Sequence, residues 1–150
     1  MATKKKATKS KGGAKNAPLI ALYGFDLDTE RGQMLRRVIK EMGFGLRTVA
    51  AEQLNNPVGY VASLIGYRPA LQAFADAAPA CEFLLMCNLS NKQMDDFLMA
   101  LKVTGIKVDR KAVLTKFNRD WSFAQLIGEV NQEHQALAQG LAEQQAGKEE

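Results

Sequence analysis

Polar side chains follow several of the apolar runs in this sequence, at the points where those runs end. Asp26 and Asp28 come after the run Leu19–Tyr23, and Asn88 directly follows the run Phe83–Cys87. Because ligands of open α/β sheets bind at the carboxyl ends of parallel strands, such side chains could form one pocket. The simpler interpretation is that they are helix caps and turn formers, which these residue types favour. The candidate strand-end pocket consists of Asp26, Asp28, Asn88, Thr115 and Lys116.

The residue types that most often carry out catalysis are few and isolated. His134 is the only histidine, and its spacing from Val130 and Leu137 places it on a helical stripe. No histidine can be placed beside Cys81 or Cys87 to activate a thiolate. The glycines form neither a phosphate-binding loop nor a dinucleotide-binding pattern, and two cysteines do not make a metal-binding set. We therefore predict no catalytic residue, no metal site and no cofactor, and we expect that the protein is not an enzyme.

The apolar pattern around these residues predicts strands that alternate with helices. Because helices separate the strands, we expect an α/β fold with a four-stranded, mostly parallel sheet and helices on both faces. The strands are predicted at Leu19–Tyr23, Leu46–Ala51, Phe83–Cys87 and Arg110–Leu114. The helices are predicted around residues 34–42, 58–77, 90–104 and 122–141, the second interrupted at Arg68-Pro69.

Two strand-to-helix junctions share a local pattern. Ser90 precedes Gln93 by three residues, and Ser122 precedes Gln125 by the same spacing. Ser-x-x-Gln is a capping box, in which the two side chains satisfy backbone N–H groups at a helix start. These junctions therefore predict where the last two helices begin.

A faint internal repeat accompanies this alternation. The pattern Asn56-x-x-Gly59-x-Val61-x-x-Leu64-Ile65-Gly66 returns 62 residues later as Asn118-x-x-Trp121-x-Phe123-x-x-Leu126-Ile127-Gly128. Chance similarity between Leu- and Ile-rich helices explains it equally well. A true duplication predicts two halves related by a pseudo-two-fold axis. A duplicated strand-helix-strand unit could also fold as a ferredoxin-like antiparallel sheet, which is the alternative topology.

The segment after the fourth strand carries an uncommon spacing. Lys111-Ala-Val-Leu-Thr115 is followed by Asn118-x-x-Trp121-Ser122-Phe123-x-x-Leu126. This Thr…Asn-x-x-Trp signature resembles that of a small, uncharacterised bacterial family known as a domain of unknown function. Leu22-Tyr23-Gly24-Phe25 before a helix is similar too, so that the resemblance spans roughly residues 18–133. The sequence departs from it at Lys116-Phe117, where a Pro-containing turn is expected. The resemblance implies a bacterial cytosolic protein and no particular activity.

A weaker resemblance is to the receiver domains of bacterial signalling. Their pocket combines acids after the first strand, an acceptor Asp, a Thr and a Lys, which correspond here to the candidate strand-end residues. Asn88 stands where the acceptor carboxylate would be. An amide cannot form an acyl phosphate and brings no negative charge to Mg²⁺. The resemblance therefore implies at most a degenerate receiver-like signalling domain.

The net charge of +4 is unevenly distributed along the chain. Residues 1–17 contain six of the 20 basic residues and none of the 16 acidic ones, so the remainder carries −2. Their composition predicts a disordered tail, followed by a single α/β domain over 18–138 and a fraying C-terminal tail over 139–150. The lysines that could contact nucleic-acid phosphates are Lys4, Lys5, Lys6, Lys9, Lys11 and Lys15.

Two classes of function follow from these observations. The first is a non-catalytic regulatory or protein-interaction module with an unidentified protein or small-molecule partner. The second is a nucleic-acid-associated protein whose lysine tail makes sequence-independent phosphate contacts, with a tail that only aids solubility as the simpler alternative. No apolar run approaches the roughly 20 residues of a membrane span, and the N-terminus lacks the apolar core of a secretory signal. We therefore expect no membrane association and a cytoplasmic location.

Overall fold

The computed structural model describes the backbone of residues 17–149 and the side chains of residues 17–137. The predicted disordered tail over residues 1–17 lies outside the described residues except for Ala17, and of the predicted fraying tail over 139–150 only the backbone up to residue 149 is described. The elements, in chain order, are β2 (Leu19–Tyr23), α1 (Glu30–Glu41), β3 (Gly45–Thr48), the 3₁₀ turn η2 (Ala51–Gln53), α2 (Val58–Val61), β4 (Phe83–Cys87), α3 (Asn91–Thr104), β5 (Lys111–Val113) and α4 (Phe123–Glu149).

The strands form one mixed sheet in the order β3-β2-β4-β5. The pairs β2–β3 and β4–β5 are parallel, whereas the central pair β2–β4 is antiparallel. The predicted α/β class, the four strands and the mostly parallel pairing are therefore observed. The ferredoxin-like alternative placed the third strand between the first two, but β4 pairs with β2 on the side away from β3.

The antiparallel centre arises from the connection between β3 and β4. A long helix that crosses a sheet face returns the chain in the same direction, as α1 and α3 do. The helix predicted over residues 58–77 is instead the single turn α2, after which residues 62–82 form no helix or strand. Ser63 and Gly66 take positive φ angles of 65° and 94°, and Pro69 follows, so a helix cannot continue here. Because no long helix crosses the sheet between β3 and β4, the chain enters β4 antiparallel to β2.

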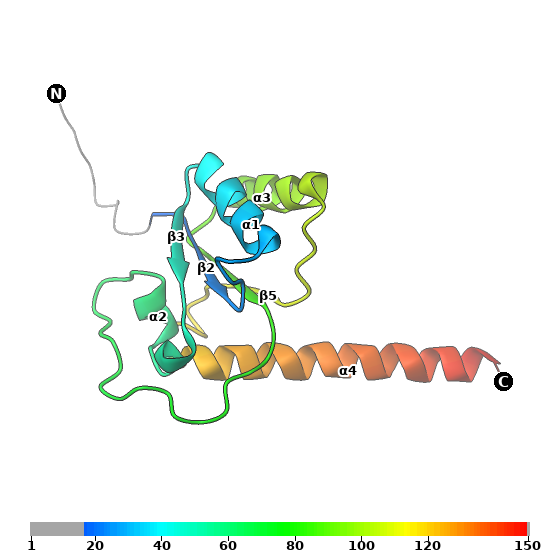
Figure 1. Ribbon diagram of the computed structural model, residues 1–150. Helices are drawn as coiled ribbons and strands as arrows, with labels where there is room; N and C mark the ends of the chain where they lie inside the picture. The colour runs from blue at the N-terminus through cyan, green and yellow to red at the C-terminus, as the bar shows by residue number, and fades with distance from the viewer. Residues whose placement is uncertain (1–16, 150) are drawn as a thin grey trace.

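Helices cover both faces of the sheet, as predicted (Figure 1). Side chains alternate along the central strands, so that Ile20 and Leu22 face one layer while Ala21 and Tyr23 face the other. The first layer includes buried residues of α1 and α3, and the second includes buried residues of α2 and of the first turns of α4. Both faces of β2 and β4 are therefore buried, which explains their almost continuously apolar sequences.

The capping box predicted at Ser90 is complete, and the one predicted at Ser122 has its serine half. Ser90 accepts a hydrogen bond from the N–H of Gln93, whose side chain in turn accepts one from the N–H of Ser90. Ser122 accepts a hydrogen bond from the N–H of Gln125. The cap of α1 is Thr29, the residue after Asp28. These local interactions position the ends of the helices that flank the candidate sites described below.

The segments that lead into α2 and α4 pair with each other across the molecule. The N–H of Val58 donates to the carbonyl of Trp121 at 2.8 Å, and the N–H of Phe123 donates to the carbonyl of Asn56 at 2.9 Å. These two hydrogen bonds flank an isolated antiparallel bridge between Pro57 and Ser122. The bridge therefore ties the segment before α2 to the segment before α4.

Candidate functional site

The five residues of the predicted strand-end pocket lie at two opposite ends of the sheet. Leu19 pairs with Cys87 and Tyr23 pairs with Phe83, so the carboxyl end of β2 lies beside the amino end of β4. Asp26 and Asp28 follow the carboxyl end of β2 and therefore lie away from Asn88. The side-chain amide of Asn88 instead donates to the carbonyl of Ala17, just before β2 begins, at 3.3 Å. The predicted single pocket is not formed, because its geometry requires parallel central strands.

Asn88, Thr115 and Lys116 do lie at the same end of the sheet, after the carboxyl ends of β4 and β5, but their contacts are those of turn formers. Asn88 has a φ of 63°, in the left-handed region that Asn tolerates. The Thr115 hydroxyl accepts hydrogen bonds from the backbone N–H groups of Phe117 and Asn118. The Lys116 ammonium lies 5.4 Å above the Phe117 ring. A receiver-like site would need Asp26 and Asp28 at this same end of the sheet, but they lie at the opposite end.

The Thr…Asn-x-x-Trp signature builds the turn between β5 and α4. The buried Asn118 side chain accepts a hydrogen bond from the N–H of Thr115 at 2.9 Å and donates to the carbonyl of Val113 at 3.0 Å. Trp121 supplies the backbone carbonyl that receives the N–H of Val58, and its side chain is partly buried against the second core layer. The signature residues therefore have structural contacts that join the two halves of the fold.

The cysteines and the histidine do not come together in the described part of the chain. Cys87 is fully buried in β4, and burial raises the pKa of its thiol from 9.0 to about 12. Cys81 is partly buried just before that strand, and His134 is exposed on α4. A thiol with so high a pKa is almost entirely protonated near neutral pH, which makes Cys87 a poor nucleophile.

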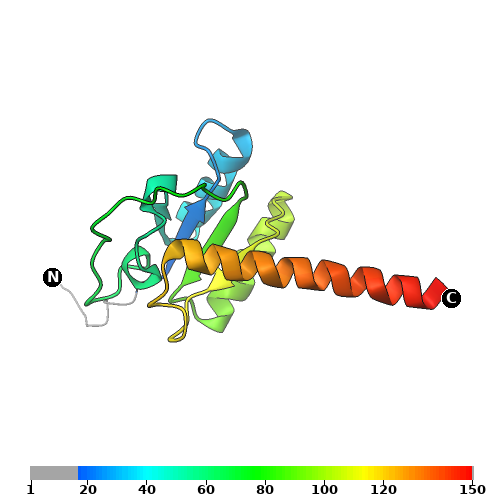
Figure 2. The ribbon, with the colours of Figure 1, turned by 90° about the horizontal axis from the view of Figure 1, so that it is seen from below.

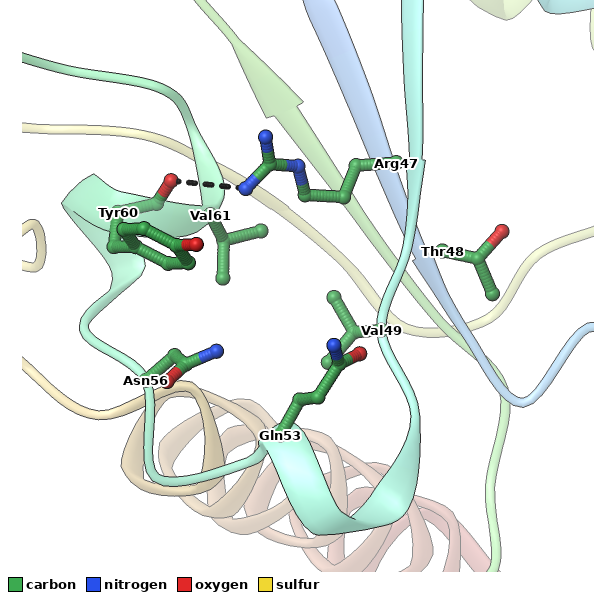
Figure 3. A pocket seen from close by; sticks show the side chains of 7 residues that line it. All are labelled: Arg47, Thr48, Val49, Gln53, Asn56, Tyr60 and Val61. Carbon is green, nitrogen blue, oxygen red and sulfur yellow. Dashed lines mark hydrogen bonds between the residues drawn. The ribbon is translucent and has the colours of Figure 1, made fainter. Parts of the chain in front are cut away.

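A polar pocket of about 320 Å³ lies between the edge strand β3 and the α2 turn (Figure 3). None of its polar lining residues belonged to the predicted site. The pocket is lined by Arg47, Thr48, Val49, Gln53, Asn56, Tyr60 and Val61. Thus β3 contributes one wall, η2 the second, and α2 with the residues before it the third.

Arg47 is the charged group of this pocket. Its guanidinium lies 5.5 Å from the centre of the Tyr60 ring and donates to the Tyr60 carbonyl at 3.2 Å and to the Ser63 hydroxyl at 3.3 Å. None of the ion pairs within the described part of the chain involves Arg47. The stacked geometry therefore orients a positive charge toward the pocket without a carboxylate to neutralise it.

Backbone hydrogen bonds fix the orientation of both amide side chains in the pocket. The side-chain oxygen of Gln53 accepts from the N–H of Ala50, and the side-chain oxygen of Asn56 accepts from the N–H of Ala70, both at 2.8 Å. Since the oxygens are engaged, the Nε2 group of Gln53 and the Nδ2 group of Asn56 remain as donors on the pocket side (Figure 3).

Sequence reasoning missed this pocket because no motif marks it. Arg47 falls within a predicted strand, and its neighbours in the pocket come from a turn and a helical segment. The one available signal was an arginine inside a mostly apolar predicted strand. Only the contact between β3 and α2 assembles these residues into a pocket.

Helix α4 is the second feature of interest, because most of it extends away from the domain (Figures 1 and 2). Its 27 residues span about 40 Å. Phe123, Leu126 and Ile127 are buried against the sheet, but residues 132–137 are all exposed. Leu137 in particular has 68% of its surface exposed. No helix in the described part of the chain is both long and apolar enough to cross a membrane.

The comparisons with known proteins concern the C-terminal half of the chain. Residues 82–137 match a family described as Domain of unknown function (DUF3783). The resemblance predicted from the Thr…Asn-x-x-Trp signature is thereby confirmed for this segment, which contains Thr115, Asn118 and Trp121. The similarity noted at Leu22-Tyr23-Gly24-Phe25, like the Arg47 pocket, falls outside it. No curated protein and no solved structure matches the chain.

Proposed function

We propose that this protein is a non-catalytic interaction module that binds a partner α-helix along the exposed part of α4. The observation that carries the proposal is that the helix continues past the sheet with Leu137 exposed (Figure 2). An isolated helical segment of this length is only marginally stable in water, so a partner would stabilise it.

The spacing of residues on α4 supports a helix as the partner. Val130, His134 and Leu137 follow one another at intervals of four and three residues. Such a 4-3 spacing aligns side chains into a narrow stripe of the kind that pairs in coiled coils. Ile127 continues the same stripe into the buried part of the helix, so the exposed portion is an extension of the core-facing side.

The simplest partner is α4 of a second copy of the protein. A stripe on one helix is complementary to the same stripe on another helix when the two are related by a two-fold axis. His134 lies at the centre of the described part of the stripe and would face the partner helix.

Sedimentation velocity of the full-length protein at increasing concentration tests this function. We expect a concentration-dependent dimer and a loss of association in Leu137→Asp. Gln135→Asp is the matched control, because it adds the same charge two residues earlier, on a different side of the helix. A protein that stays monomeric at all concentrations, or equal weakening by both substitutions, would exclude α4 pairing.

The non-catalytic part of the proposal is supported by the state of Cys87. The buried thiol has a pKa of about 12, and its strand is covered on both faces. Two free cysteines are also compatible with the reducing cytosol of bacteria, the setting that the family resemblance implies. We include this bacterial cytoplasmic location in the proposal.

We also propose that the two halves of the fold arose by duplication of a strand-helix-strand-helix unit. Support comes from the parallel pairs β2–β3 and β4–β5, which lie on the two sides of the antiparallel pair β2–β4. Gly24 and Asn88, which follow the two central strands, both have positive φ angles, of 84° and 63°. In an alignment of relatives, clear similarity between the first and second halves would support this origin, and its absence would contradict it.

A further inference from the structure

We propose that the pocket between β3 and α2 is a binding site for a small molecule that carries an oxyanion, either a carboxylate or a phosphate group. The proposal rests on the groups that line the pocket and is independent of α4. Its polar wall combines the Arg47 guanidinium with the side-chain amides of Gln53 and Asn56. Each of these groups presents N–H donors to the pocket, and an oxyanion is the ligand that accepts from several donors at once.

The donor character of the pocket follows from hydrogen bonds already made elsewhere. The acceptor oxygens of Gln53 and Asn56 are taken by backbone N–H groups, so neither amide can turn to present oxygen without losing a bond. Arg47 uses two contacts to hold the Tyr60 carbonyl and the Ser63 hydroxyl and keeps further N–H groups. An anion would therefore meet donors that are held in place before it binds.

The charge balance of the pocket also favours an anion. Its lining contains one arginine and no aspartate or glutamate. Glu52, beside Gln53 in η2, is exposed and does not line the pocket. The chain thus leaves an oriented guanidinium next to a cavity, where a bound carboxylate or phosphate would supply the missing negative charge.

The other half of the fold lacks this arrangement at the equivalent place. Arg47 pairs with Ala21, Ala21 pairs with Leu85, and Leu85 pairs with Ala112 on the opposite edge. Ala112 thus takes the position that Arg47 has in the first half. The charged group is therefore not required by the architecture, since a small apolar residue fills the corresponding position.

The shape of the pocket limits the size of the ligand. A volume of about 320 Å³ is at the lower end of small-molecule sites. The buried side chains of Val49 and Val61 provide an apolar part of the lining. A compact molecule whose oxyanion reaches Arg47 and whose apolar part contacts these valines would fit the pocket.

Nuclear magnetic resonance titrations of the full-length protein test the site, with inorganic phosphate and benzoate as the two probes. Ionic strength is held constant with chloride. We expect saturable shifts of the Arg47 Nε–H signal and of the side-chain amide signals of Gln53 and Asn56. Saturation by phosphate alone would identify a phosphate-bearing ligand, and saturation by benzoate alone a carboxylate-bearing one. Saturation by both would support an oxyanion site of either kind.

Two substitutions and one control distinguish the pocket from general charge effects. Arg47→Met should weaken binding roughly tenfold or more, as expected for the loss of a charged hydrogen-bond donor. Arg37→Met removes the same charge from an exposed position on α1 and should leave binding unchanged. Gln53→Glu keeps an acceptor for the Ala50 N–H but places a negative charge in the pocket, so it should abolish binding without unfolding the protein.

The proposal is overturned if neither probe gives saturable shifts up to about 50 mM, well above the millimolar range of a weak site. It is equally overturned if Gln53→Glu binds as well as the unmodified protein, or if Arg37→Met and Arg47→Met weaken binding alike. Loss of α4 association would leave these titrations unaffected, so this proposal and the proposed function fail separately.

Discussion

At the residue scale, the Thr…Asn-x-x-Trp signature is explained by the hydrogen bonds that its residues make in the turn between β5 and α4. Asn118 is buried, and its amide binds the Thr115 N–H and the Val113 carbonyl, both on the β5 side of the turn. A buried amide with both ends engaged is costly to replace, because its partners then lose their hydrogen bonds without gaining water. This gives a physical reason for the Thr…Asn spacing that the sequence displays.

We expect Asn118→Ala to lower the free energy of unfolding by about 1–3 kcal/mol, since it leaves the Thr115 N–H and the Val113 carbonyl unpaired. Urea denaturation followed by circular dichroism measures the change. Asn91→Ala, at an exposed position in the first turn of α3, is the control and should change stability by less than about 0.5 kcal/mol. Equal effects would mean that the Asn118 bonds do not hold the turn.

Cys87 provides a second prediction at this scale. Its pKa is raised from 9.0 to about 12 by burial, so the thiol form is favoured in the folded protein. The contribution of this thiol to the free energy of unfolding is fully present below pH 9. It is lost as the pH rises toward 12, because in that range the thiol ionises in the unfolded chain but not in the folded one. We expect thiol reagents at pH 8 to label Cys81 in the native protein and Cys87 only after denaturation.

Mass spectrometry of the labelled protein distinguishes the two cysteines. Cys81→Ser should abolish native labelling, while Cys87→Ala should leave it unchanged. Rapid labelling of Cys87 in the native protein would show an accessible thiolate and would reopen the case for nucleophilic chemistry.

At the scale of elements, the single turn α2 and the irregular segment 62–82 behave as one unit. Tyr67 lies over Gly59, and its hydroxyl donates to Asp120 at the far side of the interface between the halves. Further hydrogen bonds tie the segment to Asn55, Asn56 and Tyr23. The irregular connection over residues 62–82 is therefore held by hydrogen bonds at several points, consistent with its position beside the Arg47 pocket.

The substitution Gly59→Ala tests whether the contact of Tyr67 with Gly59 holds this connection in place. A methyl group at Gly59 would lie 2.6 Å from the Tyr67 ring, so the ring must move and its hydrogen bond to Asp120 is disturbed. We expect a loss of about 1–3 kcal/mol in stability and faster proteolysis within residues 62–82. Limited proteolysis with mapping of the cleavage sites measures the second effect.

Gly128→Ala is the matched control for this substitution. Nothing lies within 4 Å of a methyl group built there, and the residue is inside α4, where alanine is favoured over glycine. It should raise stability by up to about 1 kcal/mol. A loss of stability in both variants would contradict the specific role assigned to the Gly59–Tyr67 contact.

At the scale of the whole molecule, the charge of the chain is divided between its N-terminal segment and the remainder. The lysines from Lys4 to Lys15 lie outside the described residues, and the rest of the chain carries a net charge of −2. Any nucleic-acid binding should therefore depend on the first 17 residues and be independent of base sequence.

Fluorescence anisotropy with a labelled random-sequence duplex measures this dependence. We expect a slope of log K against log salt no steeper than about −5, from roughly −0.9 for each phosphate neutralised. Deletion of residues 1–17 should abolish binding and leave the melting temperature nearly unchanged. Retained affinity after deletion would place a recognition surface on the α/β domain, and no binding by the full chain at low salt would exclude the nucleic-acid alternative.

The local elements and the class of the fold could be predicted from the residues alone. The runs Leu19–Tyr23 and Phe83–Cys87 are strands with the predicted bounds, because residues buried on both faces of a sheet must be apolar without interruption. The capping box at Ser90 began a helix for an equally local reason, since its hydrogen bonds join residues three apart. The Thr…Asn-x-x-Trp spacing was recognisable because it encodes one short turn.

The direction of β4 and the location of the candidate sites depend on contacts between distant elements, which local patterns do not encode. Strand direction depends on how a connection crosses the sheet, and the short α2 followed by residues 62–82 allowed the antiparallel pairing that separated Asp26 from Asn88. The Arg47 pocket likewise required β3 and α2 to meet, since its donors come from separate elements. Apolar periodicity records which side of an element is buried, but it does not record which element buries it.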